Sequence, residues 1–449
     1  MKTLDEFLNK QYRTKTPAKG SAVLQKQRKK LYGRELPEGW EIVKLRDIFT
    51  PVDMKSRRIR VQDNTKYMLI SASLYSKGIK FREWKFGREI KTKTMYIVHA
   101  GDFIFSKIRA KQGAYGFIPP QLEGAIVSNE YPILKLNQKV ALQEFIEYCL
   151  SQPIMWGLFG QYSRGLKDKS RTKVNEFLEV KIALPPLEEQ RKIVYVLKTV
   201  QRAIEQQEKR IETTKELKKA LMNRLFTKGL DPNQPTKMTE IGEIPEHWEL
   251  KKISNVGRVV TGKTPSTSKK EYWEGGKYPF ITPGDIPSDF IFVKTTERYV
   301  TEKGLHVANP IPKLSILVVC IGSSIGKIGM SIFDNSITNQ QINAIVPNLK
   351  TFDPFFIYYA LSYIFPIIKK KASPNPVPII NKSNFESLKI PVPPTLEEQR
   401  RIAQILLAVD KKIELAQQKR KALEELFSTL GHKLMTGQIR VSNLKIPTE

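Results

Sequence analysis

The sequence predicts an α+β protein with two tandem α+β globular units, separated by two long antiparallel helices that form a coiled coil with pseudo-two-fold symmetry. Two observations predict this. An apolar seam with steps of three and four residues extends from Leu187 to Phe226 and again from Leu396 to Met435, which indicates paired helices of about forty residues, or roughly 60 Å. Short β-branched runs fill the chain before each seam, as in a mixed α+β unit.

Both predicted helices carry start signals. The first seam follows Pro185-Pro186-Leu187-Glu188-Glu189-Gln190-Arg191, and the second follows Pro393-Pro394-Thr395-Leu396-Glu397-Glu398-Gln399-Arg400. Proline is tolerated in the first turn of a helix, and glutamate there favours the positive end of the helix dipole. Gly229 and Pro232 mark the end of the first helix. Gln207 and Arg420 interrupt the seams, and we expect them to face each other and fix the register.

The globular units repeat as well. Leu36-Pro37-Glu38-Gly39-Trp40-Glu41 is matched by Ile244-Pro245-Glu246-His247-Trp248-Glu249, and Val127-Ser128-Asn129 is matched by Ile337-Thr338-Asn339. Helical periodicity appears near residues 142–150 and 354–363. Strands are expected at Tyr67–Ile70, Met95–Val98, Asp102–Phe105, Tyr131–Leu136, Pro279–Thr282, Ser315–Ile321 and Ile342–Val346.

The repeats divide the chain into arm, unit, helix, linker, unit, helix and tail. If the helices pair antiparallel, the two units lie at opposite ends of one rod and can touch two separated places at once. The predicted boundaries are residues 1–35 for a basic N-terminal arm, 36–186 for the first unit, 187–229 for the first helix, 230–243 for the linker, 244–394 for the second unit, 395–437 for the second helix and 438–449 for the C-terminal tail.

Charge indicates the class of partner. The chain has 75 Lys and Arg against 45 Asp and Glu, a formal charge of +30. Such an excess indicates a polyanionic partner, nucleic acid before an acidic membrane surface, with a solvated basic surface as the alternative. Cys149 and Cys320 lack the spacing of a zinc site or a disulfide framework. No signal peptide or membrane-length apolar run is present, so we expect a cytoplasmic protein.

The repeated motifs, together with Thr261-Gly262-Lys263-Thr264-Pro265-Ser266, resemble the specificity (S) subunit of type I restriction–modification systems over roughly residues 36–440. The resemblance implies that each unit is a target recognition domain for one half of a bipartite site in double-stranded DNA, and that the helices set the distance between the halves. It also implies a chain that is no enzyme on its own and binds no cofactor. Such a chain scaffolds two adenine-N6 methyltransferase subunits, which use S-adenosylmethionine, and restriction subunits, which use ATP with Mg.

One stretch matches a nucleotide-binding pattern. Residues Gly257 to Thr264 fit the phosphate-loop consensus, which requires a preceding strand and a helix that opens at Lys263. Pro265 argues against that helix. We therefore favour a loop in which Lys263 and nearby hydroxyls meet DNA phosphates, with a nucleotide site or an ordinary turn as alternatives.

Further loops are expected to face DNA because glycine allows close approach and Arg, Lys and Gln reach phosphates or base edges. Residues 322–327 and 107–112 occupy equivalent places in the two halves. Basic loops of different sequence at 164–173 and 369–375 suit halves that read different bases. Plain hairpin turns and solvated loops are the alternatives. The candidate DNA-contacting residues are Lys107, Arg109, Lys111, Gln112, Arg164, Lys167, Lys169, Arg171, Lys173, Lys263, Thr264, Ser266, Lys269, Ser323, Ser324, Lys327, Lys370, Lys371 and Asn375.

The sequence shows no catalytic constellation, and its four histidines are scattered. The leading interpretation is sequence-specific, salt-sensitive binding to a site whose halves lie about one helical turn apart. One alternative is a coiled-coil assembly protein that binds DNA without specificity. Another is a nucleotide hydrolase that uses Lys263.

Overall fold

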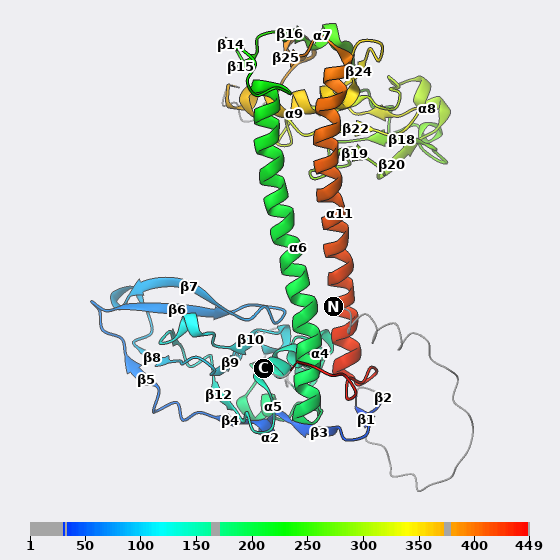
Figure 1. Cartoon of the computed structure of the whole chain (residues 1–449). Coiled ribbons are helices and arrows are strands. Elements are labelled where there is room, and N and C mark those ends of the chain that lie inside the picture. Colours follow the sequence, from blue (N-terminus) through cyan, green and yellow to red (C-terminus); the bar gives the residue numbers. More distant parts are fainter. Residues whose placement is uncertain (1–29, 32–33, 163–170, 372–378, 448–449) are drawn as a thin grey trace, which may run out of the picture. The chain divides into compact units, whose positions relative to one another are not determined.

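The computed structural model describes residues 30–31, 34–162, 171–371 and 379–447 (Figure 1). The chain divides into two compact units, of which the first contains residues 1–204 and 422–449 and the second contains residues 205–421. Each long helix begins in one unit and ends in the other.

The long helices are present where the seams predict them. In the first unit, the start of helix α6 (Leu187–Lys228) and the end of helix α11 (Leu396–Met435) share one buried core, which includes Ile193 and Leu434. In the second unit, the end of α6 and the start of α11 share another, which includes Leu225 and Ile402. The helices therefore run antiparallel, and the predicted pairing is confirmed.

The seam continues through Ile211, Val409 and Ile413, which form a small buried cluster in the second unit. Gln207 is buried beside this stretch. Arg420 Nη1 lies 3.8 Å from Oε1 of Glu208, the neighbour of Gln207. The polar interruption lies where the sequence places it, while the direct pairing of Gln207 with Arg420 stays a prediction.

The first unit contains an antiparallel sheet in the order β10-β9-β12-β4 and a second sheet in the order β5-β8-β11-β6-β7, in which β11 and β6 run parallel. The rings of Phe105 and Phe177 stack in the core with centroids 4.1 Å apart. The elements are β1 Lys30–Leu31, β2 Arg34–Glu35, β3 Glu41–Lys44, α2 Leu45–Ile48, β4 Phe49–Pro51, β5 Arg58–Arg60, β6 Lys66–Ala72, β7 Ile79–Phe86, β8 Thr94–Ile97, β9 Phe103–Phe105, β10 Tyr115–Phe117, β11 Ile126–Val127, β12 Ile133–Leu136, α3 Gln143–Leu150, α4 Pro153–Tyr162, α5 Val174–Leu178 and β13 Lys181–Leu184.

The second unit contains a sheet in the order β17-β24-β21-β22-β19 and a three-stranded sheet in the order β20-β18-β23. Trp248 packs edge-on against Phe226 of α6, with ring centroids 6.0 Å apart. The elements are β14 Thr236–Thr239, β15 Gly242–Pro245, β16 Glu249–Lys252, α7 Ile253–Val256, β17 Gly257–Thr261, β18 Tyr278–Ile281, β19 Phe292–Val293, β20 Arg298–Val300, α8 Glu302–His306, β21 Ile316–Val319, β22 Ile328–Ser331, β23 Ile337–Thr338, β24 Ile342–Pro347, α9 Pro354–Lys371, α10 Lys382–Ser387 and β25 Lys389–Val392.

The two units share one framework. The strand order β4-β12-β9-β10 of the first recurs as β17-β24-β21-β22 in the second, and the parallel pair β6–β11 recurs as β18–β23. The small sheet of β3 and β13 recurs as β16 and β25. The predicted α+β class and duplication are confirmed, and the predicted strands coincide with observed ones.

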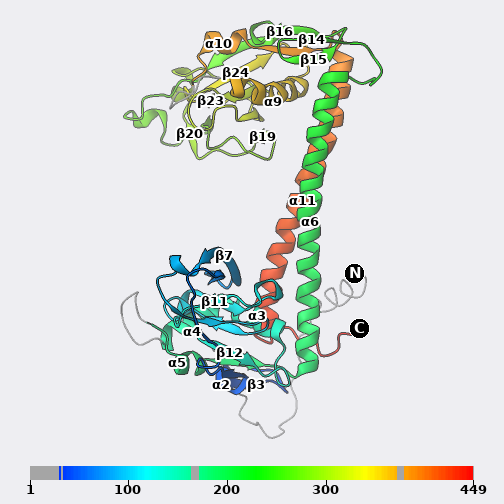
Figure 2. The same cartoon turned by 90° about the vertical axis from the view of Figure 1, so that its left-hand side faces the viewer.

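The units differ at one sheet edge. Strand β6 pairs with the eight-residue strand β7, whereas its counterpart β18 pairs with the three-residue strand β20 (Figure 1; Figure 2). Strand β7 and the helices α4, α5 and α10 were not expected from the sequence.

Candidate nucleic-acid interface

The repeated motifs meet each other at one joint in each unit. Trp40 Nε1 donates a hydrogen bond to Glu189 Oε2, and Trp248 Nε1 donates one to Glu398 Oε1, both at 3.0 Å. An indole N–H that is buried needs such an acceptor. The tryptophan that opens each globular unit is thus fixed to the start of the helix that follows it.

The glutamine of each helix start completes the joint. Gln190 is fully buried, accepts the backbone N–H of Leu142 at 2.8 Å and donates to the carbonyl of Val140 at 3.1 Å. Gln399 likewise accepts the N–H of Asp353 at 2.9 Å. These motif residues therefore hold the globule on its helix.

A further nitrogen-bearing side chain contacts the glutamate of each joint, from a different place in the chain in each unit. Arg440, in the C-terminal tail, donates from Nε and Nη2 to the two oxygens of Glu189 at 2.7 and 2.8 Å. In the second unit, His247 Nε2 lies 3.1 Å from Glu398 Oε2. Val441 and Leu444 are buried in the first core, so the tail belongs to that unit.

In the first unit, the loop between β9 and β10 carries the predicted residues 107–112. Lys107 Nζ donates to the carbonyl of Asn129 at 2.7 Å, while Arg109 is exposed. Lys111 and Gln112 are half-buried in a turn that ends at Gly113. Gly113 has φ +75°, and a Cβ there would lie 2.8 Å from Ser76 N, so the loop is tightly packed on its inner side.

The equivalent loop of the second unit connects β21 to β22. Ser323 and Ser324 are exposed at its tip. Lys327 is half-buried, and its Nζ donates to the carbonyl of Pro283 at 3.0 Å. In both loops, therefore, one lysine is engaged by a backbone carbonyl, and the exposed side chains are those left to meet a partner.

The phosphate-loop pattern forms a strand and an extended segment. Residues 257–261 are β17, and no helix opens at Lys263, which is exposed. Gly262 packs so closely that an added Cβ would lie 2.0 Å from the carbonyl oxygen of Asn339. Thr264 Oγ1 donates to Gln340 Oε1 at 2.7 Å. A nucleotide-cradling turn is not formed here, and the glycine serves packing instead.

The remaining predicted residues of this stretch lie at the surface. Ser266 Oγ is 2.8 Å from Ser268 Oγ, and its carbonyl accepts the indole N–H of Trp273 at 3.1 Å. Lys269 Nζ lies 5.4 Å from the ring centroid of Tyr272. These groups hold an exposed loop in place beside Lys263.

The basic loops are only partly within the described residues. Arg164, Lys167, Lys169 and Asn375 lie outside them, as do the side chains of Lys370 and Lys371 at the end of α9. Lys173 is exposed at the start of α5. Arg171 Nη2 pairs with Glu130 Oε1 at 3.2 Å.

Both units bring these segments to the same place on the framework. In the first unit, Thr172 N donates to the carbonyl of Lys107 at 2.7 Å, so the end of one basic loop adjoins the β9–β10 loop. In the second unit, Ile380 N donates to the carbonyl of Cys320 at 2.8 Å, which places residues 379–380 beside the β21–β22 loop. The repeated segments that end at Asn129 and Asn339 lie next to Lys107 in the first unit and next to Gly262 in the second.

The sequence did not indicate one prominent surface feature, the exposed aromatic rings of β7. The rings of Phe81 and Trp84 are exposed, and their centroids lie 6.3 Å apart. Alternation of aromatic and basic residues in Ile79–Phe86 was the available signal. The second unit has Arg298 3.8 Å over the ring of Trp273 instead.

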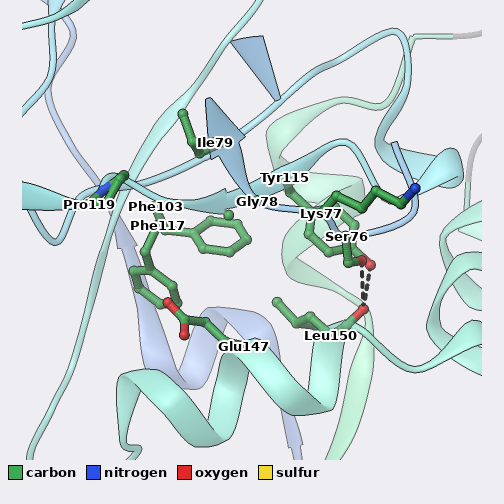
Figure 3. A pocket seen from close by; sticks show the side chains of 11 residues that line it. Ser76, Lys77, Gly78, Ile79, Phe103, Tyr115, Phe117, Pro119, Glu147 and Leu150 are labelled. Carbon is green, nitrogen blue, oxygen red and sulfur yellow. Dashed lines mark hydrogen bonds between the residues drawn. The ribbon is translucent and has the colours of Figure 1, made fainter. Parts of the chain in front are cut away.

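A cavity of about 390 Å³ lies in the first unit between the β6–β7 turn, β10 and α3 (Figure 3). Its floor is apolar and includes Phe103 and Phe117, while Lys77 and Glu147 stand at its rim. Burial raises the pKa of Glu147. The hydroxyls of Ser76 and Tyr115, which line this cavity, both donate to the carbonyl of Leu150, at 3.3 and 2.7 Å.

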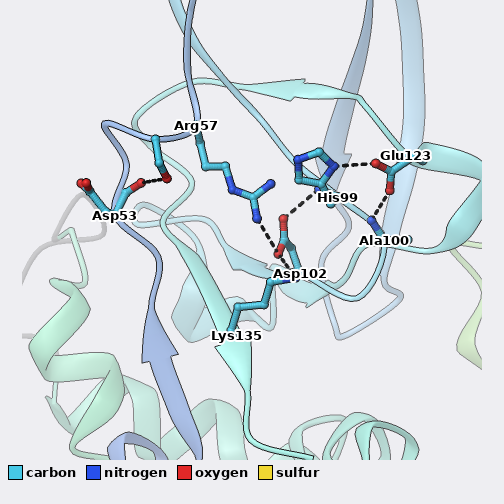
Figure 4. Close-up of polar contacts among 8 residues, drawn as sticks. Asp53, Arg57, His99, Ala100, Asp102, Glu123 and Lys135 are labelled. Atoms are coloured by element: carbon cyan, nitrogen blue, oxygen red, sulfur yellow. Dashed lines mark hydrogen bonds and ion pairs between the residues drawn. The ribbon is translucent and has the colours of Figure 1, made fainter.

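A buried carboxylate also lies in the first unit (Figure 4). Asp102 is fully buried, and its Oδ1 lies 2.8 Å from Lys135 Nζ and 3.5 Å from Arg57 Nη2. Its Oδ2 accepts the backbone N–H of His99 at 2.8 Å. The carboxylate ties β5 and β12 to the start of β9, so it is structural.

The described part of the chain shows neither a metal-binding cluster nor a membrane-spanning helix. No group of three or more His, Cys, Asp or Glu side chains could hold a metal ion there. Over the same residues, no helix has the length and apolar character needed to cross a bilayer. Burial raises the pKa of the Cys149 thiol to about 12 and that of Cys320 to about 11, so both stay protonated at neutral pH.

Comparison with known proteins identifies the repeat. The family model described as the type I restriction modification DNA specificity domain matches residues 37–214 and again residues 245–425. The chain is 28% identical over 414 residues to the putative type I restriction enzyme MjaX specificity subunit of Methanocaldococcus jannaschii, covering 91% of this chain and 95% of that protein. It is 29% identical over 441 residues to the MjaVIII specificity subunit of the same organism, covering 93% and 96%.

The fold has relatives among solved structures. One chain, from a structure described as explaining complex assembly and conformational transition of the type I R-M system, aligns with a TM-score of 0.56 at 19% identity. The alignment covers 90% of this chain and all of that chain. At this identity the likeness concerns the fold.

Proposed function

The chain belongs to the family of type I restriction–modification DNA specificity proteins, and from this membership we propose that it reads a bipartite site in double-stranded DNA, with one half for each globular unit. The observation that carries the proposal is the convergence of loops in both units. Exposed residues of different sequence, such as Arg109 in one unit and Ser323 in the other, extend from the same framework position. A shared scaffold with different loops is what two readers of different half-sites require.

Charge supports DNA as the partner. The formal charge of +30 favours a polyanion, and its phosphate contacts would make binding strongly salt-dependent. We propose that the chain itself carries out no chemistry. It positions two adenine-N6 methyltransferase subunits that use S-adenosylmethionine, and restriction subunits that use ATP with Mg. This function places the chain in the cytoplasm, where it meets DNA.

The decisive experiment is co-expression of the chain with its modification subunit, followed by sequencing of modified bases in host DNA. The proposal expects N6-methyladenine in a motif of two short defined parts separated by an undefined spacer. A single continuous motif, or no motif at all, would contradict it. Equal and weak binding to cognate and random duplexes would favour an assembly protein without specificity.

Matched variants in the two loops test whether each globular unit reads one half of the DNA site. Arg109→Ala should relax the motif in one half only, and the double substitution Ser323→Ala and Ser324→Ala should relax it in the other. Each lost base contact is worth about 1–3 kcal/mol of discrimination. If either variant altered both halves, the one-unit, one-half assignment would be wrong.

A further inference from the structure

Strand β7 presents three exposed aromatic rings on one edge of the first unit. Phe81, Trp84 and Phe86 have exposed fractions of 49%, 50% and 38%. Large rings are normally buried or used in contacts, so three neighbouring exposed rings indicate a surface that a partner covers.

Basic side chains of β7 and of the segments next to it surround these rings. Lys66 Nζ lies 5.9 Å from the ring centroid of Trp84, and the guanidinium of Arg88 lies 5.1 Å from that of Phe86. Lys80 and Arg82 flank Phe81 along the strand and are exposed, and Arg82 Nε also lies 3.1 Å from Oε1 of Glu83. Rings combined with cations suit a partner that has both phosphates and flat bases, and a basic surface disfavours a basic or purely apolar partner.

The strand is fixed to the candidate interface. In the turn that joins β6 to β7, Tyr75 N donates to the carbonyl of Gln112 at 2.8 Å, and Ser76 N donates to the carbonyl of Gly113 at 2.9 Å. Tyr75 and Ser76 have φ of +59° and +53°, a conformation that non-glycine residues rarely adopt. The turn is therefore held in one geometry by the loop that carries Arg109.

We propose that β7 is a DNA-contacting strand of the first unit, in which Phe81 and Trp84 pack against bases or sugars at the edge of one half-site while Lys80 and Arg82 meet the phosphates. Aromatic side chains can enter a groove and stack at a weakened base step. The inference rests on the proposed function and deepens it for the first unit, whose strand β7 has eight residues, whereas the counterpart strand β20 has three.

The test uses the full chain assembled with its modification subunit and a duplex that carries the methylated motif. Trp84→Ala is expected to weaken binding about tenfold, because stacking of one base on an aromatic ring is worth that order of affinity. Trp84→Phe should retain most of the affinity, since it keeps a ring. Duplex should quench the fluorescence that Trp84 contributes, measured as the difference between wild type and Trp84→Phe.

Leu217→Ala is the matched control, because Leu217 is an exposed apolar side chain at 52% on α6. It should bind as tightly as the wild type. Circular dichroism and a thermal melt check that each variant is folded. Footprinting should show protection lost by Trp84→Ala in one half of the site and kept in the other.

Three results would overturn the inference. The first is an unchanged affinity of Trp84→Ala for the duplex. The second is an equal loss of affinity in Trp84→Ala and Leu217→Ala. The third is loss of the modification subunit from the purified Trp84→Ala complex, which would make β7 a protein-docking strand. A wild-type complex without preference for any duplex would refute the proposed function instead. Quenching of Trp84 by a random duplex would then still support β7 as a DNA surface.

Discussion

The two units attach the same tyrosine to the long helices by different chemistry. In the first unit, Tyr148 donates its hydroxyl to Gln201 Oε1 at 2.9 Å, and its ring meets Phe427 at 6.0 Å. Its counterpart Tyr359 donates to Asp410 Oδ2 at 2.6 Å. Lys218 occupies the place of Phe427 and pairs with Asp410 Oδ1 at 2.7 Å.

One helical turn away, the ionic contact is in the first unit and the apolar contact is in the second. Glu144 and Lys198 form an ion pair at 2.9 Å in the first unit, where the second unit places the apolar residues Phe355 and Leu407. The hydrogen bond from tryptophan to glutamate, by contrast, is present in both units at 3.0 Å. The duplication thus keeps the geometry of the globule–helix contact, while each individual contact can be ionic in one unit and apolar or neutral in the other.

The largest expected difference in unfolding free energy between equivalent positions is at the residue that precedes β9 in the first unit and β21 in the second. Asp102→Ala leaves Arg57 and Lys135 without their buried anion and should lower the free energy of unfolding by about 3–5 kcal/mol. Ser315→Ala, at the start of β21, removes one hydroxyl that donates to the carbonyl of Pro312 and should cost about 1 kcal/mol. Urea unfolding of the two variants measures the difference. Equal losses would mean that the buried ion pairs contribute little.

The tyrosine contacts should differ next. Asp410→Ala removes the acceptor of Tyr359 and the partner of Lys218, at a cost of about 2–3 kcal/mol, whereas Gln201→Ala removes one hydrogen bond, at about 1 kcal/mol. Hydrogen exchange followed by mass spectrometry should show faster exchange in α9 for the first variant and a smaller effect in α3 for the second. The reverse order would contradict the comparison.

A smaller effect is expected at the joints. Glu189→Gln keeps an acceptor for Trp40 but weakens the pairing with Arg440, so the free energy of unfolding should fall by about 1 kcal/mol. Trypsin should then cleave at Arg440 sooner than in the wild type. Glu398→Gln is the matched control and should leave that cleavage rate unchanged. Equal rates in all three proteins would show that the charge does not hold the tail.

The last expected effect is absent at neutral pH and appears only at alkaline pH. Burial raises the pKa of Cys149 from 9.0 to about 12 and that of Cys320 from 9.0 to about 11. At a pH above the pKa that the thiol has in the unfolded chain, the unfolded chain releases a proton that the folded chain keeps. The free energy of unfolding therefore falls as the pH rises. Each thiol contributes a slope of about 1.4 kcal/mol per pH unit in its window. Cys149→Ala should remove this contribution over a wider pH range than Cys320→Ala, as measured by denaturation at several pH values.

The sequence predicted the parts of the fold that depend on local periodicity. The seams around Ile193 and Ile402 and the buried run at Ile316–Val319 are long or strongly apolar, so their structure follows from their own residues. Strand β7 could not be predicted with equal ease. Its rings are exposed rather than buried, and its pairing with β6 contains a register shift between Leu69 and Ile70 that the sequence does not indicate.

The candidate interface was predictable in outline. Loops rich in glycine and lysine were identified, but their contacts depend on tertiary structure. Nothing local in the sequence shows that Lys107 and Lys327 are engaged by backbone carbonyls. The engagement of Glu189 by both Trp40 and Arg440 joins residues from three distant parts of the chain, which no local pattern can reveal.

The docking of the tail has a consequence for synthesis on the ribosome. The second unit is one continuous stretch, residues 205–421, and can close as soon as that stretch has emerged. The first unit, although made first, takes Leu434, Val441 and Leu444 from the far end of the polypeptide into its core. Its apolar surface therefore stays partly uncovered until translation reaches these residues, and during that interval a nascent chain is most exposed to chaperones and to aggregation.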